Sequence, residues 1–378
     1  MRASRIHAAA VALAAAAVLA LLQPAAAQRW TEERANAWYA SQPWLVGANY
    51  APAYAVNQLE MWQPDTFNLT AIGRELALAQ DLGFTSLRVF LHDLLWRDDD
   101  AGLLARMDQF LGVASARGIG IMFVLFDGVW DPYPVAGPQP APVPNVHNSR
   151  WVQGPGREIL GSPARHDELE PYVVGVVSHF RNDSRVQVWD LFNEPDNPVP
   201  QYADEELPDK AARALDLLRK TFEWIRPLDP IQPLTAGVWA GDWSSEGSLS
   251  EIQRYQLDNS DVISFHNYAG PDDVAKRIAD LRRYNRPILC TEYMARSAGS
   301  TFEGVMPVLA AENVGAYNWG FVDGKTQTIF PWDSWDREYT GEPDPWFHDV
   351  FREDGTPYST AETDLIKSLT GAAARRRR

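Results

Sequence analysis

The feature that most constrains the fold is a regular alternation of short apolar runs with amphipathic stretches along the 378 residues. Most of the apolar runs contain almost no polar residue, which is typical of parallel strands that are buried on both faces. The sequence predicts strands at Trp44–Tyr50, Ser86–Leu91, Gly120–Phe126, Val186–Phe192, Pro233–Val238, Val262–His266, Pro287–Thr291 and Val314–Trp319.

Amphipathic stretches between these runs predict helices. They include Ile72–Leu82, Leu103–Ala116, Leu169–Phe180, Lys210–Ile225, Asp272–Tyr284 and Ala361–Leu369. Eight strands that alternate with helices predict an α/β fold, a single-domain (β/α)8 TIM barrel with long βα loops. An open doubly wound sheet is the alternative, but no Gly-x-Gly-x-x-Gly motif follows the first strand. The barrel is therefore preferred.

The two ends of the chain differ in composition from the part between them. Arg2 and Arg5 precede an apolar run from Ala8 to Leu22, and the run is followed by Ala25-Ala26-Ala27. This pattern predicts a secretory signal peptide over residues 1–27 and a periplasmic or secreted protein. An uncleaved anchor is the alternative, although the run is short for a membrane span. We expect a catalytic domain over 28–372 and a disordered basic tail over 373–378.

A proline-rich segment, residues 131–165, follows the third predicted strand. Such composition is also found in linkers, but the fourth strand follows and the barrel requires it. We therefore predict a long, stiff loop, and long loops in compact domains are usually functional. Together with the loop after the eighth strand, it would close one end of a cleft and favour action at chain ends.

The composition excludes several classes of function. Asp and Glu number 50 against 34 for Lys and Arg, so the formal charge is −16. This charge argues against a nucleic-acid partner and against an anionic membrane surface after signal cleavage. Cys290 is the only cysteine, which leaves no intrachain disulfide or cysteine zinc cluster. Because His-Glu-x-x-His and Gly-x-Ser-x-Gly motifs are also missing, we expect no metal and no cofactor.

Two glutamates stand at the carboxyl ends of predicted strands, where barrel enzymes carry their active sites. The fourth strand runs into Asn193-Glu194-Pro195, and the seventh ends with Glu292. In a closed barrel these strands lie roughly opposite one another, so the two carboxyl groups would face each other across the mouth. Glycoside hydrolysis uses such a pair, with different protonation states at one pH.

Further motifs occur in a fixed order: Arg88, Asn193-Glu194-Pro195, His266-Asn267-Tyr268, Glu292 and Trp319. On these motifs, from Trp44 to Trp319, the sequence resembles the clan A glycoside hydrolases, most closely the family 5 cellulases and mannanases. One departure lies at the end of the third strand. Many family 5 members have a histidine there, and this chain has Asp127-Gly128-Val129-Trp130.

The resemblance implies roles for the two glutamates and their neighbours. Glu194 would be the acid/base, and Glu292 the nucleophile of a retaining mechanism. Asn193 would hydrogen-bond the 2-hydroxyl of the sugar. Arg88 and Tyr268 would keep Glu292 ionised and oriented.

Other side chains are expected to contact substrate or to line its pocket. The resemblance places His266 near the acid/base and Trp319 under the reacting sugar, because an indole face matches the apolar face of a pyranose. Weaker candidates at strand ends and in long loops are Asn49, Tyr50, Asp127, Trp130, Trp151, Trp239, Asp242, Trp332 and Trp335.

Together, these features predict a retaining β-glycosidase whose partner is a β-linked oligo- or polysaccharide. The resemblance implies glucan, mannan or xylan. Two alternatives remain open at this point: a transglycosidase that uses the same site, and a non-catalytic carbohydrate-binding protein on a hydrolase scaffold.

Overall fold

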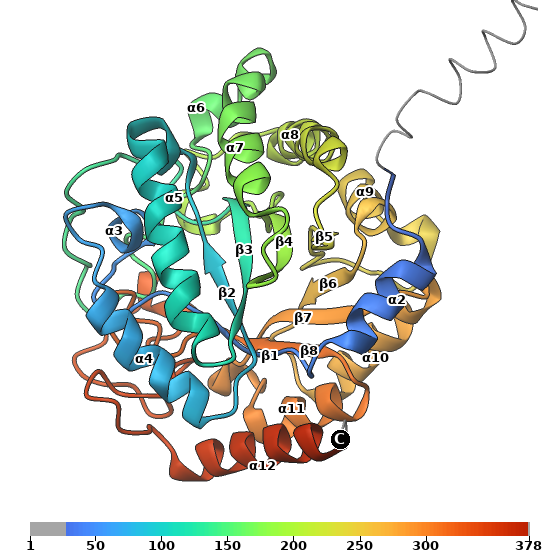
Figure 1. Ribbon diagram of the computed structural model, residues 1–378. Coiled ribbons are helices and arrows are strands. Elements are labelled where there is room, and N and C mark those ends of the chain that lie inside the picture. The colour runs from blue at the N-terminus through green and yellow to red at the C-terminus, as the bar shows by residue number, and fades with distance from the viewer. Residues whose placement is uncertain (1–27, 377–378) are drawn as a thin grey trace, which may run out of the picture.

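A barrel of eight parallel strands forms the centre of the protein (Figure 1) in the computed structural model, which describes residues 28–376. Each strand coincides with one of the predicted apolar runs. They are β1 (Val46–Asn49), β2 (Ser86–Phe90), β3 (Gly120–Asp127), β4 (Val186–Asn193), β5 (Leu234–Thr235), β6 (Ile263–His266), β7 (Ile288–Tyr293) and β8 (Gly315–Asn318).

The strands pair in chain order from β1 to β5, and β1 also pairs with β8, which continues through β7 to β6. The remaining gap, between β5 and β6, is bridged just after β5. Val238 donates its N–H to the carbonyl of Ser264 at 3.1 Å, and His266 donates to the carbonyl of Val238 at 3.0 Å. The sheet is therefore nearly closed, which confirms the (β/α)8 barrel over the open doubly wound sheet.

Helices surround the barrel (Figure 1). They are α2 (Glu32–Ser41), α3 (Gln58–Trp62), α4 (Leu69–Asp81), α5 (Asp93–Ser115), α6 (Arg157–Leu160), α7 (Glu170–Phe180), α8 (Lys210–Ile225), α9 (Glu251–Asn259), α10 (Pro271–Leu281), α11 (Phe302–Ala311) and α12 (Thr360–Arg376). Short 3-10 turns lie at Pro163–Leu169, Pro200–Tyr202, Arg226–Leu228, Glu246–Ser248, Arg282–Tyr284, Arg296–Ala298 and Trp332–Trp335. The six helices predicted above correspond to α4, α5, α7, α8, α10 and α12.

The barrel interior changes from apolar to polar along its axis. Near the amino ends of the strands it is filled by a buried cluster that includes Met122, Val188, Leu289 and Tyr317, and Tyr39 of α2 packs against this cluster. Towards the carboxyl ends the interior side chains are charged or polar. The apolar layer thus excludes water below, and the polar layer above it becomes the floor of the functional site.

The proline-rich residues 131–165 lie between β3 and α7, so they form a loop of the barrel and no linker. Helix α12 extends to Arg376, past the start of the predicted basic tail. The predicted signal peptide, 1–27, and the last two arginines lie outside the described residues. No helix in the described part of the chain is long and apolar enough to cross a membrane.

Candidate active site

One buried arginine joins four strands at the centre of the barrel mouth. The Arg88 side chain, on β2, is fully buried. Its Nη1 donates to Glu292 Oε1 and to Asn49 Oδ1, both at 2.8 Å. Its Nη2 donates to Asn193 Oδ1 at 2.7 Å, and its Nε donates to Asp190 Oδ2 at 2.9 Å. Because a buried guanidinium must be paired, this network fixes the positions of the side chains around it.

Arg88→Lys is expected to weaken folding and any reaction that Glu292 carries out. An ammonium keeps the charge but cannot reproduce the planar fork, so buried acceptors lose their donors. We expect the free energy of unfolding to fall by about 2–4 kcal/mol, and kcat/KM to fall by roughly 100-fold, a loss of about 2.7 kcal/mol in transition-state stabilisation. Urea titrations and initial rates measure the two effects.

Arg226→Lys provides the matched control, since Arg226 pairs with Asp261 at 2.7 Å away from this network. It should lower stability without lowering kcat/KM. Equal loss of activity in the two variants would contradict a role of Arg88 in the site.

Glu292 is held by donors on both carboxylate oxygens. Oε1 accepts from Arg88, and Oε2 accepts from the hydroxyl of Tyr268 at 2.7 Å. Burial raises the pKa of Glu292, while the charge of Arg88 and the hydrogen bond from Tyr268 oppose that shift. Both partners stabilise the carboxylate form, so this glutamate is the better placed of the two to act in the ionised state.

Glu194 has different surroundings. It follows β4 with a φ of 39°, a left-handed conformation that is uncommon for non-glycine residues and recurs at functional sites. Its Oε1 lies 2.7 Å from His266 Nδ1, and its Oε2 accepts from Asn197 Nδ2 at 2.6 Å. Burial raises the pKa of Glu194 to about 7. No positively charged group bonds this carboxyl directly, because burial lowers the pKa of His266 to about 4 and leaves its ring neutral near pH 7.

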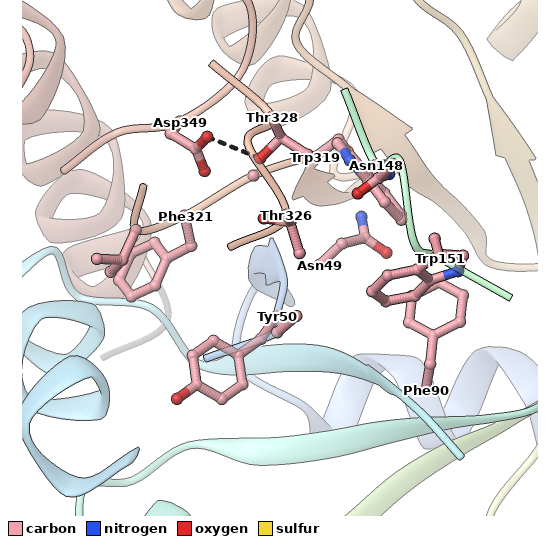
Figure 2. Close-up of a pocket in the computed structure, with 13 residues that line it drawn as sticks. Asn49, Tyr50, Phe90, Asn148, Trp151, Trp319, Phe321, Thr326, Thr328 and Asp349 are labelled. Atoms are coloured by element: carbon pink, nitrogen blue, oxygen red, sulfur yellow. Dashed lines mark hydrogen bonds between the residues drawn. The ribbon is translucent and has the colours of Figure 1, made fainter. Parts of the chain in front are cut away.

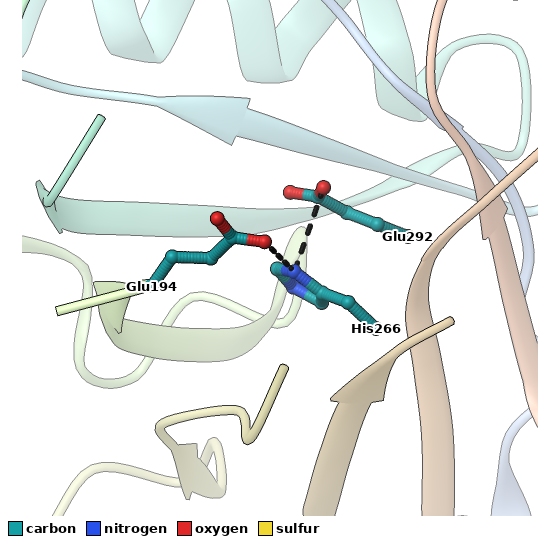
Figure 3. Close-up of side chains that lie close together, drawn as sticks. All are labelled: Glu194, His266 and Glu292. Carbon is teal, nitrogen blue, oxygen red and sulfur yellow. Dashed lines mark hydrogen bonds and ion pairs between the residues drawn. The ribbon is translucent and has the colours of Figure 1, made fainter. Parts of the chain in front are cut away.

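Glu194, Glu292 and His266 converge from three strand ends (Figure 3), as sequence reasoning placed them. One oxygen of each glutamate and one ring nitrogen of His266 all lie within 4.8 Å of one another. Such a triad has the ligand types of a metal site. However, the guanidinium of Arg88 lies 2.8 Å from Glu292, and a cation beside it would be repelled. The site is therefore better suited to acid–base chemistry than to metal binding.

Asn193 is oriented by a second buried acid. Its Nδ2 donates to Asp127 Oδ1 at 2.9 Å, and Asp127 Oδ2 accepts from Trp151 Nε1 at 2.7 Å. Burial raises the pKa of Asp127 to about 7. Asp127 and Asn49, both named above as substrate contacts, lie beneath the cavity lining, where they hold Asn193 and Arg88 in place.

A cavity of about 360 Å³ lies above the glutamates. Its lining includes four tryptophans and a tyrosine, and all five positions were candidates from the sequence. They are Trp130, Trp239, Tyr268, Trp319 and Trp332. Aromatic faces beside paired carboxylates are well suited to the apolar faces of pyranose rings.

Trp319 is fixed by edge-to-face packing on Phe90 and Trp151, with ring centroids 5.8 and 6.0 Å away. Trp130 stacks on Trp335 at 5.4 Å with an interplanar angle of 7°. Trp239 donates its Nε1 to Asp196 Oδ1 at 2.7 Å. These contacts hold the aromatic walls rigid before any ligand arrives.

Six of the weaker candidates lie outside the cavity lining: Asn49, Tyr50, Asp127, Trp151, Trp335 and Asp242. The hydroxyl of Tyr50 donates to Glu75 Oε2 at 2.7 Å, in the layer between barrel and helices. Asp242 is exposed, and its Oδ1 accepts from the N–H of Ser244. Strand-end position alone therefore did not separate cavity-lining residues from structural ones.

Several lining residues were not found from the sequence. They are Val129, His147, Asn148, Asn197, Pro198, Val199, Pro200 and Gln201. All of them lie in segments without helical or strand periodicity, and two of them belong to the 3-10 turn Pro200–Tyr202. Only Asn197 carried a usable signal, because a polar residue three positions after a strand-end glutamate can reach back to it.

No protein-family sequence model matches the chain, and no curated protein matches it in sequence. Solved structures do match its fold. An endo-1,4-β-D-mannanase from Thermotoga petrophila RKU-1, solved with maltose and glycerol, is 14% identical, with 87% of this chain and 99% of that chain covered and a TM-score of 0.53. An exo-β-1,4-mannosidase from Opitutaceae bacterium strain TAV5 is 18% identical, with coverages of 88% and 60% and a TM-score of 0.57.

A third match is GH5_18 from Streptomyces cattleya in complex with GlcNAc, which is 14% identical, with coverages of 88% and 80% and a TM-score of 0.57. These neighbours are family 5 glycoside hydrolases. The chain has their fold. At such low sequence identity the similarity extends only to the barrel fold. The chemistry of a barrel depends on the side chains at its site.

Proposed function

We propose that the protein is a retaining β-glycosidase that hydrolyses β-linked oligo- or polysaccharides. The observation that carries the proposal is the pair Glu194 and Glu292 at the base of an aromatic cavity, with oxygens of the two carboxyl groups within 4.8 Å of each other. Retaining enzymes have carboxyl groups ~5–5.5 Å apart, whereas inverting enzymes need ~6.5–9.5 Å to admit a water between carboxylate and sugar. The short separation favours retention.

The unequal surroundings of the two glutamates assign their roles. Glu292, bonded by Arg88 and Tyr268, attacks the anomeric carbon as a carboxylate. Glu194, whose pKa burial raises to about 7, gives its proton to the departing oxygen as the glycosidic bond breaks. Glu194 then takes a proton from water, which attacks the anomeric carbon, breaks the bond to Glu292 and releases the sugar.

Neighbouring side chains support both steps. In this proposal the amide of Asn193, oriented by Asp127 and Arg88, contacts the 2-hydroxyl of the reacting sugar, where hydrogen bonds strengthen in the transition state. Trp319 lies against the apolar face of that sugar. Because the fold neighbours include β-1,4-mannan-degrading enzymes, β-1,4-mannosides are the first substrates to test, with β-1,4-glucosides and xylosides beside them.

The test is release of product from a panel of β-linked oligosaccharides and aryl β-glycosides by the wild type and by Glu292→Gln. Proton NMR of the first product should show the β-anomer before mutarotation. An α-anomer as first product would overturn retention, and equal turnover by Glu292→Gln would overturn the nucleophile. Transfer of the sugar to added alcohols in place of water would indicate the first alternative, a transglycosidase. Tight binding without turnover would indicate the second, a non-catalytic carbohydrate-binding protein.

Activity should follow a bell-shaped pH profile. The rate should fall as pH rises through about 7, because Glu194 then loses the proton that it must donate. It should fall again in acid, as Glu292 becomes protonated at a pKa that burial raises above the usual value. Profiles of kcat/KM on an oligosaccharide measure both limbs. Persistence of the alkaline limb in Glu194→Gln would contradict the assignment.

A further inference from the structure

The two long loops after β3 and β8 are hydrogen-bonded to each other along one side of the cavity. The N–H of Asn148 donates to the carbonyl of Thr326 at 2.9 Å. His147 Nδ1 bonds the carbonyl of Phe330 at 2.9 Å, and Trp335 Nε1 donates to the carbonyl of His147 at 2.8 Å. Further bonds join Asn145 to Gln327 and Tyr339, Gln327 to Val143 and Val146, and the His147 N–H to Ser334. We call residues 143–148 and 326–339 together the loop wall.

The loop wall spans the carboxyl ends of β1 and β2, since β3 and β8 flank these strands in the barrel. Figure 2 shows Asn148 and Thr326 of the wall beside Asn49, around a small cavity of about 20 Å³ that Phe90 also lines. Trp151 follows the first segment of the wall, residues 143–148, by three positions. It donates a hydrogen bond to Asp127, and Asp127 orients Asn193. The segment that follows the first part of the wall is therefore connected, through Trp151 and Asp127, to the side chain that would contact the 2-hydroxyl of the reacting sugar.

The cavity lining differs in exposure between the wall and the segment after β4. His147 and Asn148 of the wall are each 1% exposed, so this side is closed by packed protein. Pro198 and Pro200, which line the cavity after β4, are exposed, and Trp335 of the wall packs on Tyr202 of the same segment with ring centroids 5.7 Å apart. Both prolines follow Glu194, the proposed proton donor to the leaving group. The cavity is thus closed by protein along the wall and exposed beside the segment that follows Glu194, where the leaving group would depart.

We propose that the enzyme acts on non-reducing ends of β-linked oligosaccharides. The terminal sugar lies against the loop wall, and one of its hydroxyl groups donates a hydrogen bond to Asn148 Oδ1. This inference rests on the proposed function. The Oδ1 of Asn148 is buried without a hydrogen-bond partner, and an unpaired buried acceptor is costly. The cavity volume, about 360 Å³, is near the lower end of the ~300–1,000 Å³ range of ligand pockets, which is consistent with a short sugar segment.

The product pattern tests this proposal. Manno- and cello-hexaose, each with a fluorescent tag at the reducing end, are digested by the wild type and by Glu292→Gln. We expect the tagged chain to shorten by the same unit at every step, and hexaoses with a 4-O-methyl group on the terminal sugar to resist. A full spread of tagged lengths at low conversion, absent with Glu292→Gln, would overturn end-specific action and leave the proposed function intact. No cleavage of any probe, or cleavage by Glu292→Gln, would overturn the proposed function itself.

The Asn148 contact has its own test. Asn148→Gly removes the amide and tolerates the left-handed φ of 47°, and Asn285→Gly makes the same change at a φ of 50° on an exposed residue away from the cavity. We expect Asn148→Gly to lower kcat/KM on the untagged disaccharide about tenfold, the loss of one hydrogen bond, and Asn285→Gly to leave it unchanged. Equal kinetics in the two variants, with equal melting temperatures, would overturn the contact.

Discussion

Glu292→Ala is expected to lose hydrolysis by roughly four orders of magnitude or more, because no other group can form the glycosyl intermediate. Azide should restore turnover of a dinitrophenyl β-glycoside in this variant. The azide would attack from the side that the carboxylate has vacated, so the product should be the α-glycosyl azide. Discontinuous rate assays and NMR of the azide adduct measure both effects.

Glu75→Ala is the matched control for this experiment. Glu75 is also a buried glutamate whose pKa burial raises to about 7, but it bonds the Tyr50 hydroxyl and the Ala53 N–H outside the cavity. Its loss should lower stability and leave the rate per folded molecule near that of the wild type. A β-glycosyl azide from Glu292→Ala would contradict the assignment of the nucleophile.

Glu194→Ala is expected to slow glycosidic cleavage selectively, according to the leaving group. General acid assistance contributes about 10²- to 10⁴-fold, so oligosaccharides with poor leaving groups should lose that factor. A dinitrophenolate leaves without a proton, and its first-step rate should change little. Azide should accelerate the second step and give the β-glycosyl azide, because it attacks the intermediate from the face where water attacks in the wild type.

The comparison of leaving groups is the internal control for Glu194, since misfolding would slow both substrates alike. Equal losses on the oligosaccharide and on the dinitrophenyl glycoside, in a variant with an unchanged melting temperature, would contradict the role of proton donor. Pre-steady-state bursts of dinitrophenol separate the two steps. A burst is expected only if the second step has become rate-limiting.

Unequal surroundings separate the chemistry of the two glutamates. Both carboxyls are buried and both have raised pKa values. Arg88 and Tyr268 donate to one of them, whereas an amide and a neutral imidazole face the other. When the pair holds one proton, that proton therefore resides on Glu194 and Glu292 is ionised. The same network connects the proposed catalysis to folding, because Arg88 holds the proposed nucleophile, Glu292, and also pairs with Asp190.

The strand positions and the placement of the two glutamates at the barrel mouth could be predicted from local sequence. A strand buried on both faces has an apolar run as its signature, and parallel strands bring all their carboxyl ends to one side. Glu194 and Glu292 follow from that rule once the runs are recognised. The supporting residues were harder to predict. Asp190 lies within an apolar strand, and its pairing with Arg88 depends on which face of β4 turns inward.

The sequence by itself determined the barrel, the order of its strands and the two glutamates, because strand periodicity and chain direction are local properties. The tertiary structure alone decided that Asp127 orients Asn193, that Tyr50 turns away, and that the loop wall closes one side. Residues 143–148 and 326–339 are far apart in the chain and have no repeating pattern. Hydrogen bonds between irregular loops arise only when the barrel brings their backbones together, so no local rule encodes them.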